Sequence, residues 1–463
     1  MKLRTMATLR RGRREVWPTT KLALPIMAGM VSQMLMGLID TLMVGRVGVV
    51  PLAASAFVIA ITHVPFVFAF GLLSSISVLA SQALGAQHRL AAGEVLRHGM
   101  VLAGAAGLAT AVGLACVRPW LHLFGQSPDV VAAAGNFLVL YGVSLLPALV
   151  AHGCKQFSEA LNHPWVPNFI LLGCVALNAV LNWILIYGNW GAPALGLDGA
   201  GVSTLIARIV MAVALIVYVI KAPALRGFQP RRWWMRLSLE KMRELLRIGW
   251  PVAFQHLMEV SAFVFAAIMM GWLSANAMAA HQIAISCAAT TFMFAFGIGM
   301  AASIRVGHAW GAQQFARMRR IGFVGIGLAG GVMAVFALLF IFASQPIAQS
   351  FVSSPEVVAL SAQLLVIAAL FQVADGVQVA AIASLRGMGD VRVPALMAIA
   401  AYWLLAVPLA YALAFQFGKG AVGIWIGLAT GLGAAAVGLS WRFHRRTRRN
   451  RLVRAAAICD AVR

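Results

Sequence analysis

Apolar runs of about 20 residues recur along the whole chain and decide what it can fold into. A helical run of this length crosses about 30 Å of hydrocarbon. Backbone groups inside a bilayer must be hydrogen-bonded within their own segment, and these runs lack the alternation of lipid-facing β-strands. Only 11% of the 463 residues are charged and 62% are hydrophobic, whereas soluble domains carry about a quarter charged residues. The sequence therefore predicts an all-α integral membrane protein.

Polar breaks separate the runs into about twelve predicted membrane-spanning helices. The predicted spans cover residues 21–44, 53–80, 91–118, 129–154, 165–188, 200–221, 242–270, 279–307, 319–343, 355–384, 394–416 and 422–441. The same breaks define a basic N-terminal tail (1–20), an N-lobe of six spans (21–221), a linker (222–241), a C-lobe of six spans (242–441) and a basic C-terminal tail (442–463).

Lys and Arg residues gather in alternate loops, which predicts the orientation of the chain. The basic segments contain Arg10, Arg11, Arg13 and Arg14, then Arg226, Arg231, Arg232, Arg236 and Lys241, then Arg317, Arg319 and Arg320, and finally Arg442, Arg445, Arg446, Arg448 and Arg449. Loops 189–199, 271–278 and 344–354 contain neither residue type. Cytoplasmic loops carry the excess of Lys and Arg, so both termini and the linker are predicted to be cytoplasmic. The net charge of +23 is then a topology signal, and no nucleic-acid partner is expected.

The second half of the sequence repeats the first. FVFAFG from Phe66 matches FMFAFG from Phe292, and LGAQ from Leu84 matches WGAQ from Trp310, both at a shift of 226. A second block, with SPDVVA matching SPEVVA, follows at a shift of 227. Six spans in each half give both halves the same orientation, so we expect two related lobes around a central cavity.

Three carboxylates fall inside predicted spans: Asp40 in the first, Glu259 in the seventh and Asp375 in the tenth. An ionisable side chain at mid-membrane costs about 2.5–3.5 kcal/mol, so it marks a pathway or a paired site. We expect no basic residue within reach, because the basic residues of the spans lie nearer their ends, namely Arg208, Arg305 and Lys155. A buried carboxylate without a partner takes up a proton or binds a cation. These acids therefore predict an ion-coupling site.

Polar side chains accompany the acids at helical spacing. Those at spacings of three or four from an acid are Gln255, His256, Gln372 and Gln378. Asn178 and Asn182 are four apart and place two amides on one side of the fifth span. For an isolated amide the alternative is an ordinary hydrogen bond between helices. The acids themselves are not repeated, since Asp40, Glu259 and Asp375 correspond to an alanine, a glutamine and an alanine in the other half.

The remaining motifs exclude other chemistry. The histidines of the spans are interpreted as satisfied core residues: His63, His152, His281 and His308. The five cysteines show no CxxC spacing, and the chain has no phosphate-binding GxxxxGK[ST] loop, no HExxH and no GxSxG. We expect neither an enzyme nor a cofactor, and transport would be driven by an ion gradient.

Five segments carry a resemblance to a known family. They are MGLIDTLMVGRVG from Met36, LNAVLNWILIYGNWGAP from Leu177, AAHQIA from Ala279, SIRVGHAWGAQ from Ser303 and VADGVQVAAIASLRGMGD from Val373. Together they cover nearly the whole chain and occur in the order found in the multidrug and toxic compound extrusion (MATE) family. The chain resembles the NorM-type bacterial branch of that family.

The resemblance implies a monomeric efflux antiporter of the bacterial inner membrane, with two six-helix lobes forming a V-shaped cleft. Such proteins export cationic and amphipathic drugs or dyes in exchange for Na⁺ or H⁺, with membrane lipid around them. Glu259 and Asp375 match the C-lobe cation site, and Asp40, Asn178 and Asn182 match a polar N-lobe cluster. The resemblance links Gln282 to drug contact, and Phe371 stands where some relatives have Tyr. That missing hydroxyl leaves the choice of coupling ion open.

Two other classes of protein remain as alternatives. A flippase for lipid-linked precursors would also have repeated helices, but it should prefer a strongly cationic cavity for anionic head groups. A channel or receptor is disfavoured by the duplication and by the mid-membrane acids on separate lobes.

Overall fold

The computed structural model describes the backbone of residues 2–230, 233 and 237–461, and the side chains of residues 14–230, 233 and 237–448. Several side chains of the predicted topology signal therefore lie outside the described residues: Arg10, Arg11, Arg13, Arg231, Arg232, Arg236 and Arg449.

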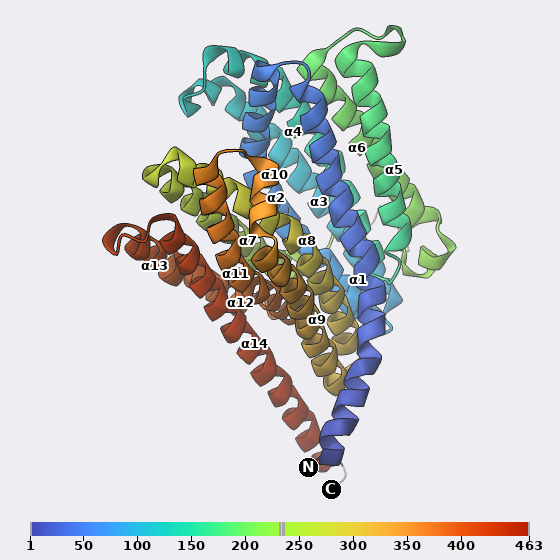
Figure 1. Cartoon of the computed structure of the whole chain (residues 1–463). Helices are drawn as coiled ribbons and strands as arrows, with labels where there is room; N and C mark the ends of the chain where they lie inside the picture. The colour runs from blue at the N-terminus through green and yellow to red at the C-terminus, as the bar shows by residue number, and fades with distance from the viewer. Residues whose placement is uncertain (1, 231–232, 234–236, 462–463) are drawn as a thin grey trace. The chain divides into compact units, whose positions relative to one another are not determined.

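All regular structure in the described part of the chain is helical (Figure 1). The helices are α1 (Lys2–Gly45), α2 (Val49–Gly85), α3 (Arg89–Val117), α4 (Pro128–Ala160), α5 (Trp165–Tyr187), α6 (Gly196–Lys221), α7 (Leu239–Leu273), α8 (Ala275–Gly311), α9 (Phe315–Phe342), α10 (Ser344–Phe351), α11 (Pro355–Gly387), α12 (Arg392–Ile399), α13 (Val407–Tyr411) and α14 (Gly420–Ala461). Three short 3₁₀ segments connect them, and two π-helical segments, Ala400–Ala406 and Ala412–Gln416, flank α13.

Twelve helical stretches in the described residues are long and apolar enough to span a membrane, which confirms the predicted number. Nine of them are α2 to α9 and α11, with the bounds given above, except that the span of α3 continues to Phe124. The other three are Arg14–Gly45 of α1, the stretch Arg392–Gln416, and Gly420–Arg448 of α14. The eleventh span is thus a continuous stretch in which α-helical and π-helical turns alternate.

The internal repeat extends to the boundaries of the helices. Both ends of α2 match the ends of α8 at the shift of the first repeat block, and both ends of α4 match those of α11 at the shift of the second. The turn after each of α2 and α8 contains a glutamine with left-handed backbone, Gln87 at φ 60° and Gln313 at φ 54°. This conformation is uncommon for a residue other than glycine, so its recurrence shows that both halves use the same turn.

Contacts divide the chain into two compact units. The N-unit is Ala28–Ala253, and the C-unit consists of the chain up to Met27 together with everything from Phe254 onward. Both boundaries fall inside a helix, α1 and α7. They occupy the same position in the repeat, because Ala28 and Phe254 are matched by the shift of its first block. The predicted lobes, residues 21–221 and 242–441, group whole membrane spans, and this grouping remains a prediction.

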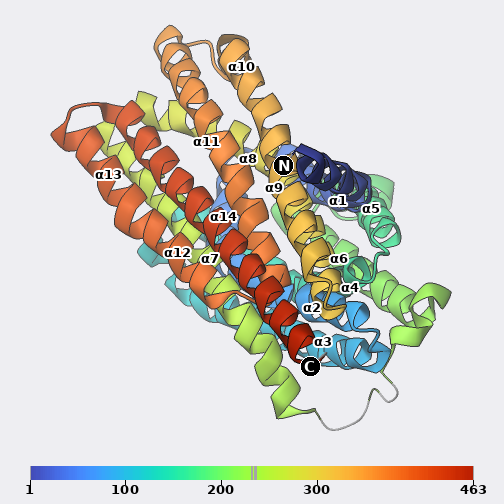
Figure 2. The same cartoon turned by 90° about the horizontal axis from the view of Figure 1, so that it is seen from below.

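Each unit packs around one central helix. In the N-unit, α4 contacts α2, α3 and α6, whereas in the C-unit α11 contacts α8, α9 and α14 (Figure 2). Glycines permit close approach where the long helices join a unit. A Cβ atom on Gly249 of α7 would overlap the Leu72 carbonyl in the N-unit, and one on Gly297 of α8 would overlap Met27 in the C-unit.

An ion pair also ties the start of α1 into the C-unit. Arg305 of α8 donates to the backbone carbonyl of Glu15 at 2.8 Å, and it forms a salt bridge with the Glu15 carboxylate. Arg317 of α9 donates to the same carboxylate at 3.2 Å. Because Glu15 is buried, these contacts compensate a charge that would otherwise be unfavourable there.

Candidate functional site

The N-unit brings together three of the predicted site residues. Asn182 of α5 donates to the Asp40 carboxylate of α1 at 2.6 Å, and its amide nitrogen also lies 3.4 Å from the Asn178 carbonyl oxygen. From α6, the hydroxyl of Thr204 donates to the second Asp40 oxygen at 3.4 Å, and Ser203 donates to Asn182. Both amides are fully buried. Their spacing of four residues places them on one face of α5, as the sequence predicts.

A guanidinium belongs to this cluster, contrary to the expectation that no basic residue lies within reach. Arg208 follows Thr204 by one turn of α6 and is close enough for its charge to act on Asp40. It donates to the Ser144 hydroxyl at 2.7 Å and lies 4.6 Å above the ring of Tyr141. The expectation is wrong because Arg208 lies near the middle of α6 (Gly196–Lys221), not near its end, and one helical turn from Thr204.

In the C-unit, the two predicted cation-site carboxylates lie close to each other. The Tyr402 hydroxyl donates to Glu259 of α7 at 2.9 Å and accepts a hydrogen bond from the Gln378 amide of α11 at 2.8 Å. Asp375, one turn before Gln378, is 5% exposed and close enough to feel the charge of Glu259. Within the part of the chain that the structure describes, the Asp375 carboxylate makes no hydrogen bond or ion pair. The arrangement is therefore a buried acidic pair of which one member lacks a protein partner.

The same unit contains a buried cation that the sequence interpretation missed. Arg386 of α11 is 7% exposed and lies 3.4 Å from both the Gln255 oxygen and the His256 Nε2 atom. His256 Nδ1 is in turn 3.8 Å from Glu259, and the charges of Arg386 and Glu259 interact. Arg386 follows Asp375 by eleven residues, which is about three helical turns, so helical periodicity places both on one face. The expectation that no basic residue lies near Glu259 is wrong.

The two remaining predicted residues differ in environment. Phe371 is 2% exposed and packs against Phe263 and Trp425, with ring centroids 6.0 and 5.6 Å away. It has no hydroxyl to offer, but Phe263 also contacts Tyr402, whose hydroxyl reaches Glu259. Gln282 is exposed on α8 and its side chain makes no hydrogen bond in the described residues. The structure therefore adds Phe371 to the surroundings of the acidic pair but leaves Gln282 without a demonstrated role.

The histidines outside these clusters only partly fit the core interpretation. His152 lies 3.1 Å from the Gln156 amide, and His281 accepts a hydrogen bond from Trp425 at 3.2 Å, both buried. For His63 the interpretation is wrong, because this side chain is exposed.

The oxygen atoms of the acidic pair decide which ligand it could bind. Carboxylate, hydroxyl and amide oxygens suit hard cations rather than transition metals. Among the described residues no group of three or more His, Cys, Asp and Glu side chains is arranged to hold a metal ion. The chemistry therefore fits a monovalent cation or a proton at Glu259 and Asp375.

Comparisons with known proteins agree with the helical fold and with the internal repeat. The MatE family model matches the chain twice, over residues 25–184 and 251–412, and the starts of the two matches are related by the shift of the internal repeat. The probable multidrug resistance protein NorM of Pseudomonas putida is 37% identical over 94% of this chain and 96% of that protein. The multidrug resistance protein NorM of Burkholderia vietnamiensis is 35% identical over 93% and 94%. The Vibrio cholerae MATE transporter VcmN in the bent form shares the fold, with a TM-score of 0.87 and 22% identity over 96% of this chain and 99% of that one.

Proposed function

Since this chain belongs to the MATE family of membrane transporters, we propose that it is a multidrug efflux antiporter. It exports cationic and amphipathic organic compounds in exchange for Na⁺ or H⁺. Support comes from relatives named for multidrug resistance, which match the chain from end to end. The family is one of transporters and not of enzymes, and the chain is a multi-pass membrane protein.

The observation that carries this proposal is the charge imbalance of the C-unit site. Glu259 and Asp375 provide two carboxylates, and Arg386 provides one guanidinium. Like charges repel strongly where water is excluded, so the second negative charge requires a cation or a proton. One monovalent ion restores neutrality, which is the stoichiometry that an ion-coupling site needs.

The N-unit cluster differs because its charges already balance. Asp40 is opposed by Arg208 and receives hydrogen bonds from Asn182 and Thr204. We therefore assign ion coupling to the C-unit, and we assign to the Asp40 cluster a role in contacting substrate. Gln282, exposed on α8, remains a candidate for drug contact.

Transport follows from neutralisation of the acidic pair. An ion entering from the periplasmic side removes the repulsion between Glu259 and Asp375, the C-unit repacks, and the drug site weakens as access alternates. Inward movement of one positive charge across 100 mV supplies about 2.3 kcal/mol. The finer expectations belong to the same proposal: a monomer in a bacterial inner membrane, with both termini in the cytoplasm. Tyr402 supplies the hydroxyl that Phe371 lacks.

Ethidium efflux from proteoliposomes of controlled orientation tests the proposal. An imposed Na⁺ gradient or an imposed pH gradient should drive efflux, and the gradient that works identifies the ion. Glu259→Gln and Asp375→Asn should each abolish coupled efflux, whereas Glu356→Gln, an exposed carboxylate on α11, should not. Efflux driven by neither gradient would favour the flippase instead. Wild-type rates in both site variants would refute the coupling role of the acids.

A further inference from the structure

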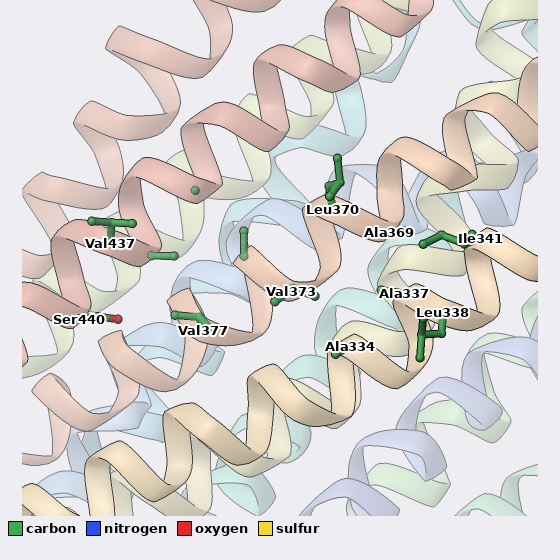
Figure 3. Close-up of a pocket in the computed structure, with 13 residues that line it drawn as sticks. Ala334, Ala337, Leu338, Ile341, Ala369, Leu370, Val373, Val377, Val437 and Ser440 are labelled. Atoms are coloured by element: carbon green, nitrogen blue, oxygen red, sulfur yellow. The ribbon is translucent and has the colours of Figure 1, made fainter.

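The C-unit has an open apolar groove between α9 and α14, with α11 as its floor (Figure 3). Its cavity volume is about 880 Å³, within the range of sites that bind small molecules. Side chains along it include Ala334, Leu338, Leu370, Val377, Val437 and Ser440. Leu370 and Val437 are 77% and 72% exposed, although both lie within membrane-spanning helices. The groove is therefore open at a depth where the surrounding solvent is lipid hydrocarbon.

Small side chains create this groove, and the repeat shows that the N-unit does not share them. Helices α6 and α14 both begin at a glycine with left-handed backbone, Gly196 and Gly420, so these two glycines align the helices. In that alignment Gly433 corresponds to Ile209, and Ser440 corresponds to Ile216. The N-unit therefore has larger side chains at the two positions where Gly433 and Ser440 line the groove.

A guanidinium lies beyond the Ser440 end of the groove. Arg319 of α9 lies 3.0 Å from His444 Nδ1 of α14, and its guanidinium is 5.3 Å from the ring centroid of Phe323. The Phe323 ring also contacts His444, so these three side chains connect α9 and α14. Ser440 lies one turn, about 6 Å along the helix axis, from His444. The Ser440 hydroxyl oxygen is buried and has no hydrogen-bond partner among the described residues.

Apolar burial alone would not select an occupant here, because lipid chains are as apolar as leucine. A preferred occupant must gain energy from its polar end. Near a membrane surface each basic side chain contributes about 1 kcal/mol to the attraction of anionic lipid. The Arg319 guanidinium lies beyond the Ser440 end of the groove, in the order of a phosphate followed by an acyl chain.

We propose that this groove binds one bilayer phospholipid with an anionic head group. An acyl chain lies along α11 between α9 and α14, with Ser440 at its head-group end, and the phosphate binds Arg319. The groove contains none of the residues proposed for drug or ion binding. The lipid proposal can therefore fail without affecting the proposed transport function, and the reverse also holds.

Native mass spectrometry of the full-length protein, titrated with phosphatidylglycerol or phosphatidylcholine of identical chains, tests the proposal. The unaltered protein should retain one phosphatidylglycerol more tightly than phosphatidylcholine. Arg319→Gln should weaken phosphatidylglycerol binding about fivefold, which corresponds to about 1 kcal/mol. Phosphatidylcholine binding should weaken less, because the choline ammonium already compensates the charge of that phosphate. Lys419→Gln, which removes an exposed cation from the opposite end of α14, should have no effect.

A second variant tests the groove itself. Gly433→Ile should weaken binding of both lipids, and a Cβ atom at this position meets nothing within 4 Å, so the fold should be retained. Gly104→Ile on α3, where the space is equally open, is the matched control. Thermal unfolding of each variant confirms that it is folded. Equal retention of the two lipids by the unaltered protein, or unchanged preference in Arg319→Gln, would overturn the proposal.

Discussion

The hydrogen bond between Tyr402 and Glu259 makes a quantitative prediction about ion affinity. Tyr402 is 1% exposed and its hydroxyl donates to the carboxylate at 2.9 Å, so water cannot replace it in a Tyr402→Phe variant. A hydrogen bond to a charged group contributes about 1.5–3 kcal/mol, or roughly a factor of 10 to 150 in an equilibrium constant. The bond stabilises the charged carboxylate, which is the proton-free state. Its loss therefore favours the protonated state.

In efflux driven by a pH gradient, Tyr402→Phe should lower the proton concentration for half-maximal ethidium efflux by at least about tenfold. The maximal rate should fall as well, because ion release becomes slower. Proteoliposome efflux, measured as a function of the driving ion, reports both values. Tyr411→Phe, which alters an exposed tyrosine nearby, is the control. An unchanged or higher half-maximal proton concentration would refute the reasoning.

Three further predictions concern buried contacts. Arg386→Gln should reduce the free energy of unfolding by about 1–3 kcal/mol in denaturant titrations, because the buried Gln255 oxygen and His256 lose their donor at 3.4 Å. Asn182→Ala should cost about 1–3 kcal/mol in the same assay, because Asp40 loses its 2.6 Å donor; an unchanged midpoint would show that Thr204 suffices. Gly249→Ala should cost about 1–3 kcal/mol by overlap with a backbone carbonyl, whereas Gly271→Ala, in open space on the same helix, should not destabilise the protein.

Membrane insertion explains why the fold could be predicted so fully from sequence. Every span must be an apolar helix long enough to cross the hydrocarbon core, and the apolar runs are visible directly in the sequence. The predicted number of spans and the predicted repeat are therefore both correct. Helical spacing was also sufficient for Asn178 and Asn182, which share a face of α5. Their partner Asp40 is 142 residues from Asn182, and no local pattern connects residues so distant.

Two residues of the C-unit site show different reasons for a missed prediction. Arg386 could have been found, since eleven residues after Asp375 is the same face of one helix. Tyr402 could not, because it lies in the π-helical segment Ala400–Ala406, where the 3.6-residue period does not apply. In sequence it is one aromatic residue in an apolar run. Only the packing of that segment directs its hydroxyl toward Glu259.

The division of α1 and α7 between the two units has a consequence for biosynthesis. Glu15 leaves the ribosome long before Arg305, its partner in the C-unit, and the whole N-unit is made between them. The C-unit therefore cannot complete its core until the last helices are inserted. A gene divided in the linker would not yield two independent halves. Each fragment would carry a helical segment that belongs to the other unit, so the two polypeptides would have to be synthesised together to assemble.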